Sequence, residues 1–238
     1  MNGSRNRRGV LLVCTCLFAF LVFAASSAQA EEKGNWRVSG VNVTEALKPS
    51  VKLGLTAHLS FNFTVNGAKV KILCNSLTTA GALFLVPFSR LTAAALLIAG
   101  CDVSINGSKS AACAPHTAGS PEGTIKTLSL KGLLVLHEGA GVIRLEPESG
   151  ETIANIVLGI EGESECAIGE TLPLSGKWTV KDPEMSTELV THTVSELEAL
   201  TDLWVLKKTA EHKVTITGSI LMSLSGAHAG LKWSGQPG

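Results

Sequence analysis

Four of the six cysteines lie after residue 30 and are the side chains best suited to chemistry: Cys74, Cys101, Cys113 and Cys166. A thiol can form a disulfide, bind a metal or act as a nucleophile. An even number of cysteines in an exported chain is typical of disulfides. We favour Cys101–Cys113, across a short excursion that contains Asn106-Gly107, with Cys74–Cys166 closing a long loop, and the other two pairings stay open. These four cysteines contain no C-x2-C pair, so a zinc site is disfavoured and no thiol remains as a nucleophile.

The usual catalytic and cofactor-binding motifs are missing from the sequence. There is no G-x-S-x-G nucleophile elbow, no H-E-x-x-H zinc helix, no P-loop and no dinucleotide-binding glycine fingerprint. The histidines are scattered without metal-ligand spacing, and we interpret each as a surface or strand-edge residue: His58, His116, His137, His192, His212 and His228. We therefore predict no catalytic residue, no metal ligand and no cofactor.

Two further sets of residues allow a chemical interpretation and a simpler structural one. Glu161, Glu163 and Glu165 alternate just before Cys166 and could bind Ca²⁺, but they lack the Asp/Asn-Gly loop that supplies further oxygens. We favour a solvated strand edge or loop. The four tryptophans could stack on a sugar ring, but packing in the core or at a strand edge explains each more simply: Trp36, Trp178, Trp204 and Trp233.

The first thirty residues have the pattern of a secretory signal peptide. Arg5, Arg7 and Arg8 precede an uncharged apolar run from Val10 to Ala25, and the segment closes on Ala28-Gln29-Ala30. This run is shorter than the ~20 residues that span a bilayer, so we expect cleavage after residue 30 and no stable membrane span afterwards.

Cleavage would change the charge balance of the chain. The whole sequence has 20 Lys+Arg against 20 Asp+Glu, and loss of the three arginines leaves 17 basic and 20 acidic groups, a net charge of −3. A protein that binds nucleic acid by neutralising phosphates is excluded on this ground. The sequence identifies no other partner.

The clearest structural signal is a β-hairpin around Asn66-Gly67. Apolar residues alternate with polar ones from Leu59 to Val65 and again from Ala68 to Cys74. An Asn-Gly pair between two such runs favours a two-residue turn, because both turn residues need positive φ. The hairpin would have one apolar face that ends at Cys74, with the lysines on the other face.

Similar alternating runs, separated by turn residues every 8–12 positions, predict an all-β fold, an antiparallel sandwich or barrel with at most one or two short helices. Gly218 is expected to be a bulge or a point of close packing. The apolar segment 81–100 predicts buried strands, or a strand and a short helix. Residues 195–206 predict a short helix from a capping-box pattern, with a turn leading into a strand at 203–207 as the alternative. No linker divides residues 31–238, which we expect to form one secreted domain, with 183–238 as its last strands or a small appendage.

The chain resembles a loose group of exported bacterial, disulfide-containing all-β proteins of unknown function. The resemblance rests on Trp36, Val38 and Gly40 soon after the cleavage site, on the placement of the cysteines, and on a glycine-rich end: Gly218, Gly226, Gly230 and Trp233. It implies an extracytoplasmic β domain with disulfides and carries no catalytic motif.

These observations favour a secreted, cell-envelope or extracellular protein with a structural or binding role and no identifiable catalytic site. Two alternatives remain. One is a hydrolase of envelope or extracellular polysaccharide, because a glycosidase carboxylate pair leaves no sequence signature. The other is a barrel that carries a small apolar ligand in a cavity.

Overall fold

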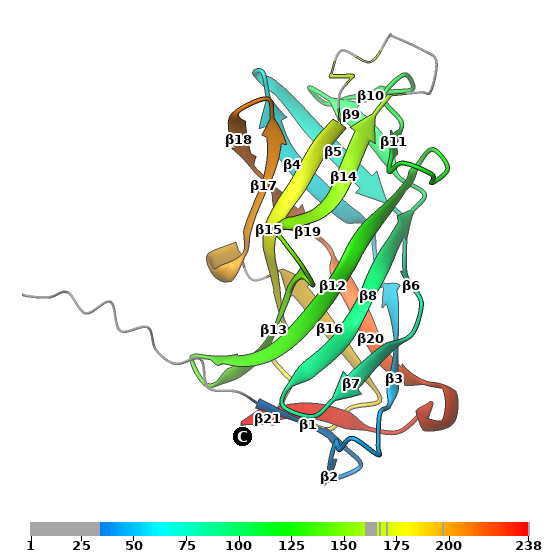
Figure 1. The fold of residues 1–238 in the computed structure, drawn as a ribbon, viewed down its shortest axis with the longest axis vertical. Helices are drawn as coiled ribbons and strands as arrows, with labels where there is room; N and C mark the ends of the chain where they lie inside the picture. Colours follow the sequence, from blue (N-terminus) through cyan, green and yellow to red (C-terminus); the bar gives the residue numbers. More distant parts are fainter. Residues whose placement is uncertain (1–33, 160–165, 167, 170, 197, 238) are drawn as a thin grey trace, which may run out of the picture. The chain divides into compact units, whose positions relative to one another are not determined.

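The computed structural model describes residues 34–159, 166, 168–169, 171–196 and 198–237 (Figure 1). The expected signal peptide and the Glu161, Glu163 and Glu165 cluster lie outside the described residues. From residue 34 on, the described chain belongs to one compact unit.

The fold is all-β, as the sequence predicts, and its only helices within the described residues are two short 3₁₀ turns, η1 (Glu198–Leu200) and η2 (Gly226–His228). The strands are β1 (Gly34–Val38), β2 (Val41–Asn42), β3 (Ser50–Leu55), β4 (Leu59–Val65), β5 (Ala68–Cys74), β6 (Ser76–Ala80), β7 (Leu83–Val86), β8 (Arg90–Ala99), β9 (Asp102–Ile105), β10 (Ser108–Ser110), β11 (Pro115–His116), β12 (Thr124–His137), β13 (Ala140–Pro147), β14 (Thr152–Leu158), β15 (Thr171–Lys181), β16 (Thr191–Glu196), β17 (Asp202–Lys207), β18 (Ala210–Lys213), β19 (Thr215–Thr217), β20 (Ser219–Ser225) and β21 (Trp233–Pro237).

The largest sheet closes on itself. Antiparallel pairings run from β8 through β12, β13, β15, β16, β20, β3 and β7 and return to β8. Each strand in this ring contributes at least one apolar side chain to a shared interior, which is what a closed sheet requires. At this end of the unit the structure therefore follows the barrel alternative.

A second, five-stranded sheet in the order β10-β9-β5-β4-β19 packs on an extension of the first. The long strands β8, β12 and β15 continue beyond the ring, and their side chains meet those of the five-stranded sheet. Phe61 and Ile216 from the smaller sheet line the same small apolar space as Ile98, Ile125 and Leu174 from the larger one. Here the packing is that of two facing sheets, so the unit combines both architectures that the sequence allows.

The predicted hairpin is confirmed, including its register. Val65 pairs with Ala68, and Leu59 pairs with Cys74. Asn66 and Gly67 both have positive φ, 51° and 77°, as the two-residue turn requires. Phe61, Phe63, Val70 and Ile72 are buried, and Lys69 and Lys71 are exposed.

The predicted helix at 195–206 is wrong, and the alternative is closer to the structure. Thr191–Glu196 is a strand that pairs with β15 and β20, and the chain reaches β17 through the single turn η1. Leu203 and Val205 are buried and follow a strand periodicity, so sheet packing overrides the local capping-box pattern.

The apolar segment 81–100 consists of strands β7 and β8 rather than a strand and a helix. Gly218 is a point of close packing: it has a φ of +135°, and a Cβ there would lie 2.6 Å from the carbonyl oxygen of His58. Strands from residues 191–237 belong to all three sheets.

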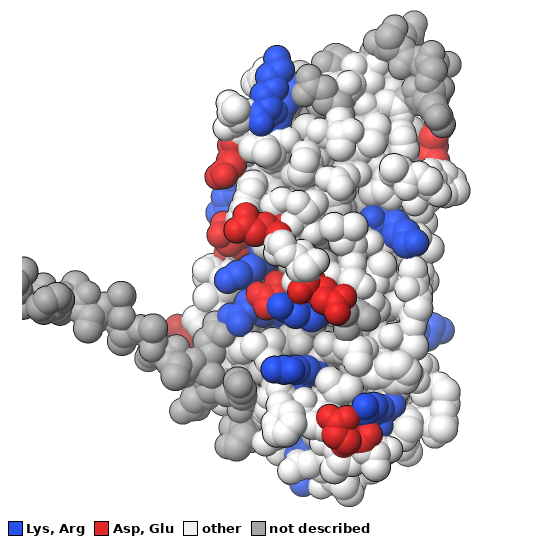
Figure 2. Space-filling model, in the orientation of Figure 1, with Lys and Arg blue, Asp and Glu red and all other residues white. Residues whose placement is uncertain are grey.

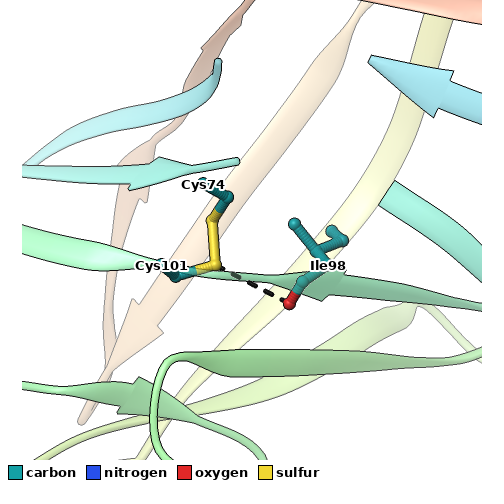
Figure 3. The surroundings of a disulfide bond; sticks show 3 residues. All are labelled: Cys74, Ile98 and Cys101. Carbon is teal, nitrogen blue, oxygen red and sulfur yellow. Dashed lines mark hydrogen bonds between the residues drawn. A yellow bond between two sulfur atoms is a disulfide. The ribbon is translucent and has the colours of Figure 1, made fainter. Parts of the chain in front are cut away.

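The four cysteines form two disulfides, but the favoured pairing is wrong. The bonds are Cys74–Cys101 and Cys113–Cys166, with Cα–Cα distances of 4.0 and 4.9 Å. Figure 3 shows the first bond, where Sγ of Cys101 also lies 3.6 Å from the carbonyl oxygen of Ile98. This is a polar contact, because a disulfide sulfur has no hydrogen to donate.

The reason for the Cys74–Cys101 pairing is a shared crossing between sheets. The chain leaves β5 for β6 at the point where it also leaves β8 for β9. Leu73 pairs with Asp102 on one side of the bond, and Ser76 pairs with Ala99 on the other. The two cysteines are therefore held side by side by four strands that belong to two sheets. A preference based on short loop length cannot include this tertiary constraint.

The third sheet joins the two ends of the described chain in the order β2-β1-β21. Its strands lie at one end of the closed sheet, below β12 and β8 in Figure 1. Gly34 and Gly235 allow the close approach of Leu134, because a Cβ at either glycine would lie 2.6–2.7 Å from a methyl carbon of that leucine.

Candidate functional site

An open groove of about 910 Å³ lies on the outer face of the five-stranded sheet and is here called the lysine groove. Its floor is the outer face of β4, β5 and β9 with the first residue of β19, and one wall comes from β18. The lining residues are Asn62, Phe63, Thr64, Lys69, Val70, Lys71, Ser104, Gly107, Glu211, His212, Lys213 and Thr215.

Strand periodicity explains why the floor is polar. Apolar side chains of the hairpin point into the core, so the intervening ones must point outward. Pairing between strands then arranges four of these into one row across the sheet: Thr215 beside Asn62, Asn62 beside Lys71, and Lys71 beside Ser104. Neighbours in such a row have Cβ atoms about 5 Å apart. The groove thus has a continuous floor of hydroxyl, amide and ammonium groups.

The charge of the groove differs in sign from that of the chain after residue 30. Three lysines and one glutamate line it, whereas residues 31–238 have an excess of acidic groups. Lys213 lies 3.7 Å from the carboxylate of Glu198, and both side chains are exposed. Within the described part of the chain, Lys69 and Lys71 have no ion pair, so their ammonium groups remain available to an anion.

On the face seen in Figure 2, acidic and basic residues lie beside one another in the middle and near the bottom, and other basic residues stand apart on uncharged surface.

The groove offers no aromatic ring to a ligand's flat face. Among the described residues that line it, the one aromatic side chain is Phe63, which is 6% exposed and points to the core. Stacking of nucleobases or of neutral sugar rings needs an exposed aromatic surface. Recognition in this groove therefore depends on charge and hydrogen bonding.

A second polar cluster lies inside the unit, at the end closed by β1 and β21. This terminal cluster consists of Trp36, Asp182, His192 and Trp233. Nδ1 of His192 lies 2.6 Å from Oδ2 of Asp182, and Nε2 lies 2.7 Å from the carbonyl oxygen of Trp233. The ring of Trp233 packs edge-on against His192 at 4.3 Å, and Trp36 lies 5.8 Å from Trp233.

The two hydrogen bonds of His192 indicate a structural role for the terminal cluster. A carbonyl oxygen only accepts, so Nε2 of His192 must carry a hydrogen and donate it to Trp233. In a catalytic triad this nitrogen would take the proton of a nucleophile. His192 is fully buried and both of its nitrogens are occupied. Oδ1 of Asp182 accepts from the backbone N–H of Glu184 at 2.8 Å, which fixes the carboxylate.

The interpretation of His192 as a surface or strand-edge residue is therefore wrong. A signal was present, because His192 is two positions from Val194 and thus on the same inward face of a strand. The other five histidines are exposed or partly exposed. Trp36, Trp178 and Trp233 are buried, as core packing predicts, and Trp204 is partly buried.

The sequence does not predict the groove. It predicts one part of the floor, because the alternation of Lys69 and Lys71 with Val70 places both lysines on one outward face of the hairpin. The wall from Glu211 to Lys213 and the floor residue Thr215 come from a distant part of the chain, and only the tertiary structure brings them to the hairpin.

Two interior spaces among the described residues are small. They have volumes of about 30 and 10 Å³ and are lined almost entirely by apolar side chains. The larger could hold about one water molecule.

Among the described residues, no three His, Cys, Asp or Glu side chains converge as metal ligands would. None of the helices in that part of the chain has the length and apolar character needed to cross a membrane.

Comparison with known proteins gives no relative: no family model, curated protein or solved structure matches the chain.

Proposed function

We propose that this protein is an extracytoplasmic, non-enzymatic β domain that binds its ligand in the lysine groove. The observation that carries this proposal is the contrast between small apolar interior spaces and an open groove whose polar floor holds two lysines without an ion pair among the described residues. A carrier of small apolar ligands would need an interior cavity of several hundred Å³. The interior spaces are more than ten times smaller.

The location outside the cytoplasm is supported by the two disulfides, which are uncommon in reducing compartments. It also agrees with the signal-peptide pattern and with the resemblance to exported bacterial proteins. Fractionation of the producing cells, followed by non-reducing peptide mapping, tests this point. We expect extracytoplasmic protein that starts at Glu31 and contains both bridges, and four free thiols would overturn it.

The role of the groove is tested by filling it. Thr64 is exposed and lines the groove, so Thr64→Trp should block a ligand without disturbing the core. Thr193→Trp is the matched control, because Thr193 is an exposed strand residue outside the groove. Both variants and the unchanged protein are applied to an array of neutral and acidic glycans. We expect binding that only Thr64→Trp abolishes; equal binding by all three proteins would refute the assignment of the groove.

A hydrolase of polysaccharide remains the second candidate, because of Glu196 at the end of β16. Burial raises the pKa of Glu196 from its ordinary value of 4.5, and repulsion from Glu198 adds to the rise, while a hydrogen bond from the Ile216 backbone and the charge of Lys213 oppose it. A carboxylic acid with a raised pKa beside a second carboxylate is the arrangement a glycosidase uses.

Glu196 is not among the residues that line the groove, and we therefore prefer the binding role. Incubation of Glu196→Gln, Glu198→Gln and the unchanged protein with polysaccharide substrates decides between the two. Release of reducing ends by the unchanged protein, lost in both variants, would establish the hydrolase and reject the non-enzymatic proposal.

A further inference from the structure

We infer that the ligand of the lysine groove is an acidic polysaccharide, whose carboxylates are bound by Lys69 and Lys71 and whose hydroxyls are bound by the row of Thr215, Asn62 and Ser104. This inference rests on the proposed function and specifies its ligand class.

The anion requirement follows from the two hairpin lysines. Lys69 and Lys71 are exposed, lie on the same face of β5 and have no ion pair among the described residues. Residues two apart on a strand are about 6.7 Å apart, so the ammonium groups can meet separate anionic groups along one chain. Lys213 adds a third cation from the wall that β18 forms. Its ammonium group lies 3.7 Å from the carboxylate of Glu198, and both side chains are exposed.

The hydroxyl requirement follows from the rest of the floor. Thr215, Asn62, Lys71 and Ser104 are neighbours in one row across four strands. The amide of Asn62 donates to the carbonyl oxygen of Thr215 at 3.4 Å and accepts from the hydroxyl of Ser60 at 3.3 Å, which leaves one hydrogen and one lone pair for a ligand. Together with the hydroxyls of Thr215 and Ser104, which both donate and accept, it suits the hydroxyls of a sugar chain. The row gives such a ligand several contacts in a direction perpendicular to the strands.

Other anionic polymers fit the groove less well. A nucleic acid would find no exposed aromatic ring for its bases, and the chain after residue 30 repels it through a net negative charge. An acidic peptide in extended form binds best to a free sheet edge, through its backbone. The floor of the groove is the face of a sheet, where the backbone groups are already paired between strands.

The size of the groove argues against a small inorganic anion. A site for a single ion gathers buried donors around one point, whereas this groove is open, has a volume of about 910 Å³ and spreads its cations over the floor and one wall. The geometry fits a segment of a polymer.

The test compares two forms of one polysaccharide, which differ in charge and share the same sugar chain. Polygalacturonate oligomers carry a carboxylate on each sugar, and fully methyl-esterified oligomers of the same length carry none. Binding of each to the purified full-length protein is measured by isothermal titration calorimetry at 50 and 200 mM salt. We expect binding of the acidic form that weakens as salt increases, and at least tenfold weaker binding of the ester.

The matched variants remove two charges from the groove or two from elsewhere. Lys69→Gln/Lys71→Gln should weaken binding of polygalacturonate at least tenfold. Lys52→Gln/Lys126→Gln removes two exposed lysines of β3 and β12 outside the groove and should change it less than twofold. Urea unfolding of all proteins shows whether each variant is folded.

Four other results would contradict the inference. If the ester binds as tightly and the Lys69/Lys71 variant weakens both ligands, the groove is the site and the acidic ligand class is wrong. If the two double variants weaken binding equally, attraction by overall charge replaces the groove contacts and the inference fails. Absence of binding to polygalacturonate, or equal Lys69/Lys71-dependent binding of inorganic polyphosphate, also overturns the acidic polysaccharide, while the Thr64→Trp experiment still judges the proposed function separately.

Discussion

The terminal cluster and the lysine groove are two polar regions that differ in the burial and pairing of their charged side chains. In the terminal cluster Asp182 and His192 are buried and paired with each other, and backbone groups supply their remaining partners; the buried indole Nε1 of Trp233 alone has no hydrogen-bond partner among the described residues of this cluster. In the groove, Lys69 and Lys71 are exposed and unpaired within the described residues. Burial with complete pairing restricts a polar group to one arrangement, whereas exposure without pairing leaves it available. Polar residues of the first region hold the fold together, and those of the second can act on other molecules.

The largest expected effect is the loss of the carboxylate in the terminal cluster. Asp182→Ala leaves a buried imidazole without its partner and should lower the free energy of unfolding by about 3–5 kcal/mol. Urea unfolding measures this change. The double variant Asp182→Ala/His192→Leu should be less destabilised than the sum of the two single variants, because no unpaired polar ring remains. A loss below about 1 kcal/mol in Asp182→Ala would contradict a structural role for the pair.

The next effect concerns the bridge that anchors the groove's central strand. Cys74→Ala/Cys101→Ala opens a loop of 27 residues and should cost about 3.5 kcal/mol by the chain-entropy relation. Cys113→Ala/Cys166→Ala opens 53 residues and should cost about 4 kcal/mol. Urea unfolding under non-reducing conditions provides both values, and each variant retains the other bridge. Peptide mapping that finds Cys101 joined to Cys113 would reject the pairing itself.

A smaller effect, of opposite sign, is expected at Glu196, which is half-buried but incompletely paired. Because its pKa is raised in the folded state, ionisation opposes folding. Its destabilising contribution begins as pH rises above the ordinary value of 4.5 and is complete above the folded-state pKa. Glu196→Gln should therefore be more stable than the unchanged protein at pH 7, with the difference vanishing at pH 4. Thermal unfolding at both pH values tests this, and equal stability gaps would contradict it.

The smallest effect on stability is expected from the groove lysines. Lys69→Gln/Lys71→Gln should change the free energy of unfolding by less than about 0.5 kcal/mol, since both side chains are exposed and make no ion pair in the described structure. Urea unfolding of this variant and of Asp182→Ala under the same conditions compares the two changes in the free energy of unfolding. A loss above 2 kcal/mol would show that the groove lysines, like the terminal cluster, serve the fold.

The sequence predicts what depends on neighbouring residues. The hairpin from Leu59 to Cys74 and its register follow from alternation and from one turn pair, Asn66-Gly67. The all-β class follows from the repeated strand and turn signals. The short 3₁₀ turn in place of a helix after Glu196 shows the limit, because pairing with β15 and β20 outweighs a local cap.

The features that the sequence does not predict all depend on distant contacts. Cys74 meets Cys101 because two strand crossings coincide. His192 acquires its role from Asp182 and from the carbonyl of Trp233, 41 residues away. The groove needs a wall from β18, far from the hairpin along the chain. Periodicity can assign each side chain to a face, but it cannot identify the element that covers that face.

The pairing of β1 with β21 has a consequence for the order in which the protein folds. Arg37 donates a hydrogen bond to Gln236 across 199 residues, and Ser50 donates to the carbonyl of Ser225 across 175. A ribosome synthesises β1 and β3 long before β20 and β21 exist, so these early strands must wait for their C-terminal partners. Contacts so distant in sequence also slow the search for the native state. The sheet can close only after synthesis is almost complete, and a chain truncated before Trp233 would leave Trp36 and His192 without the strand that covers them.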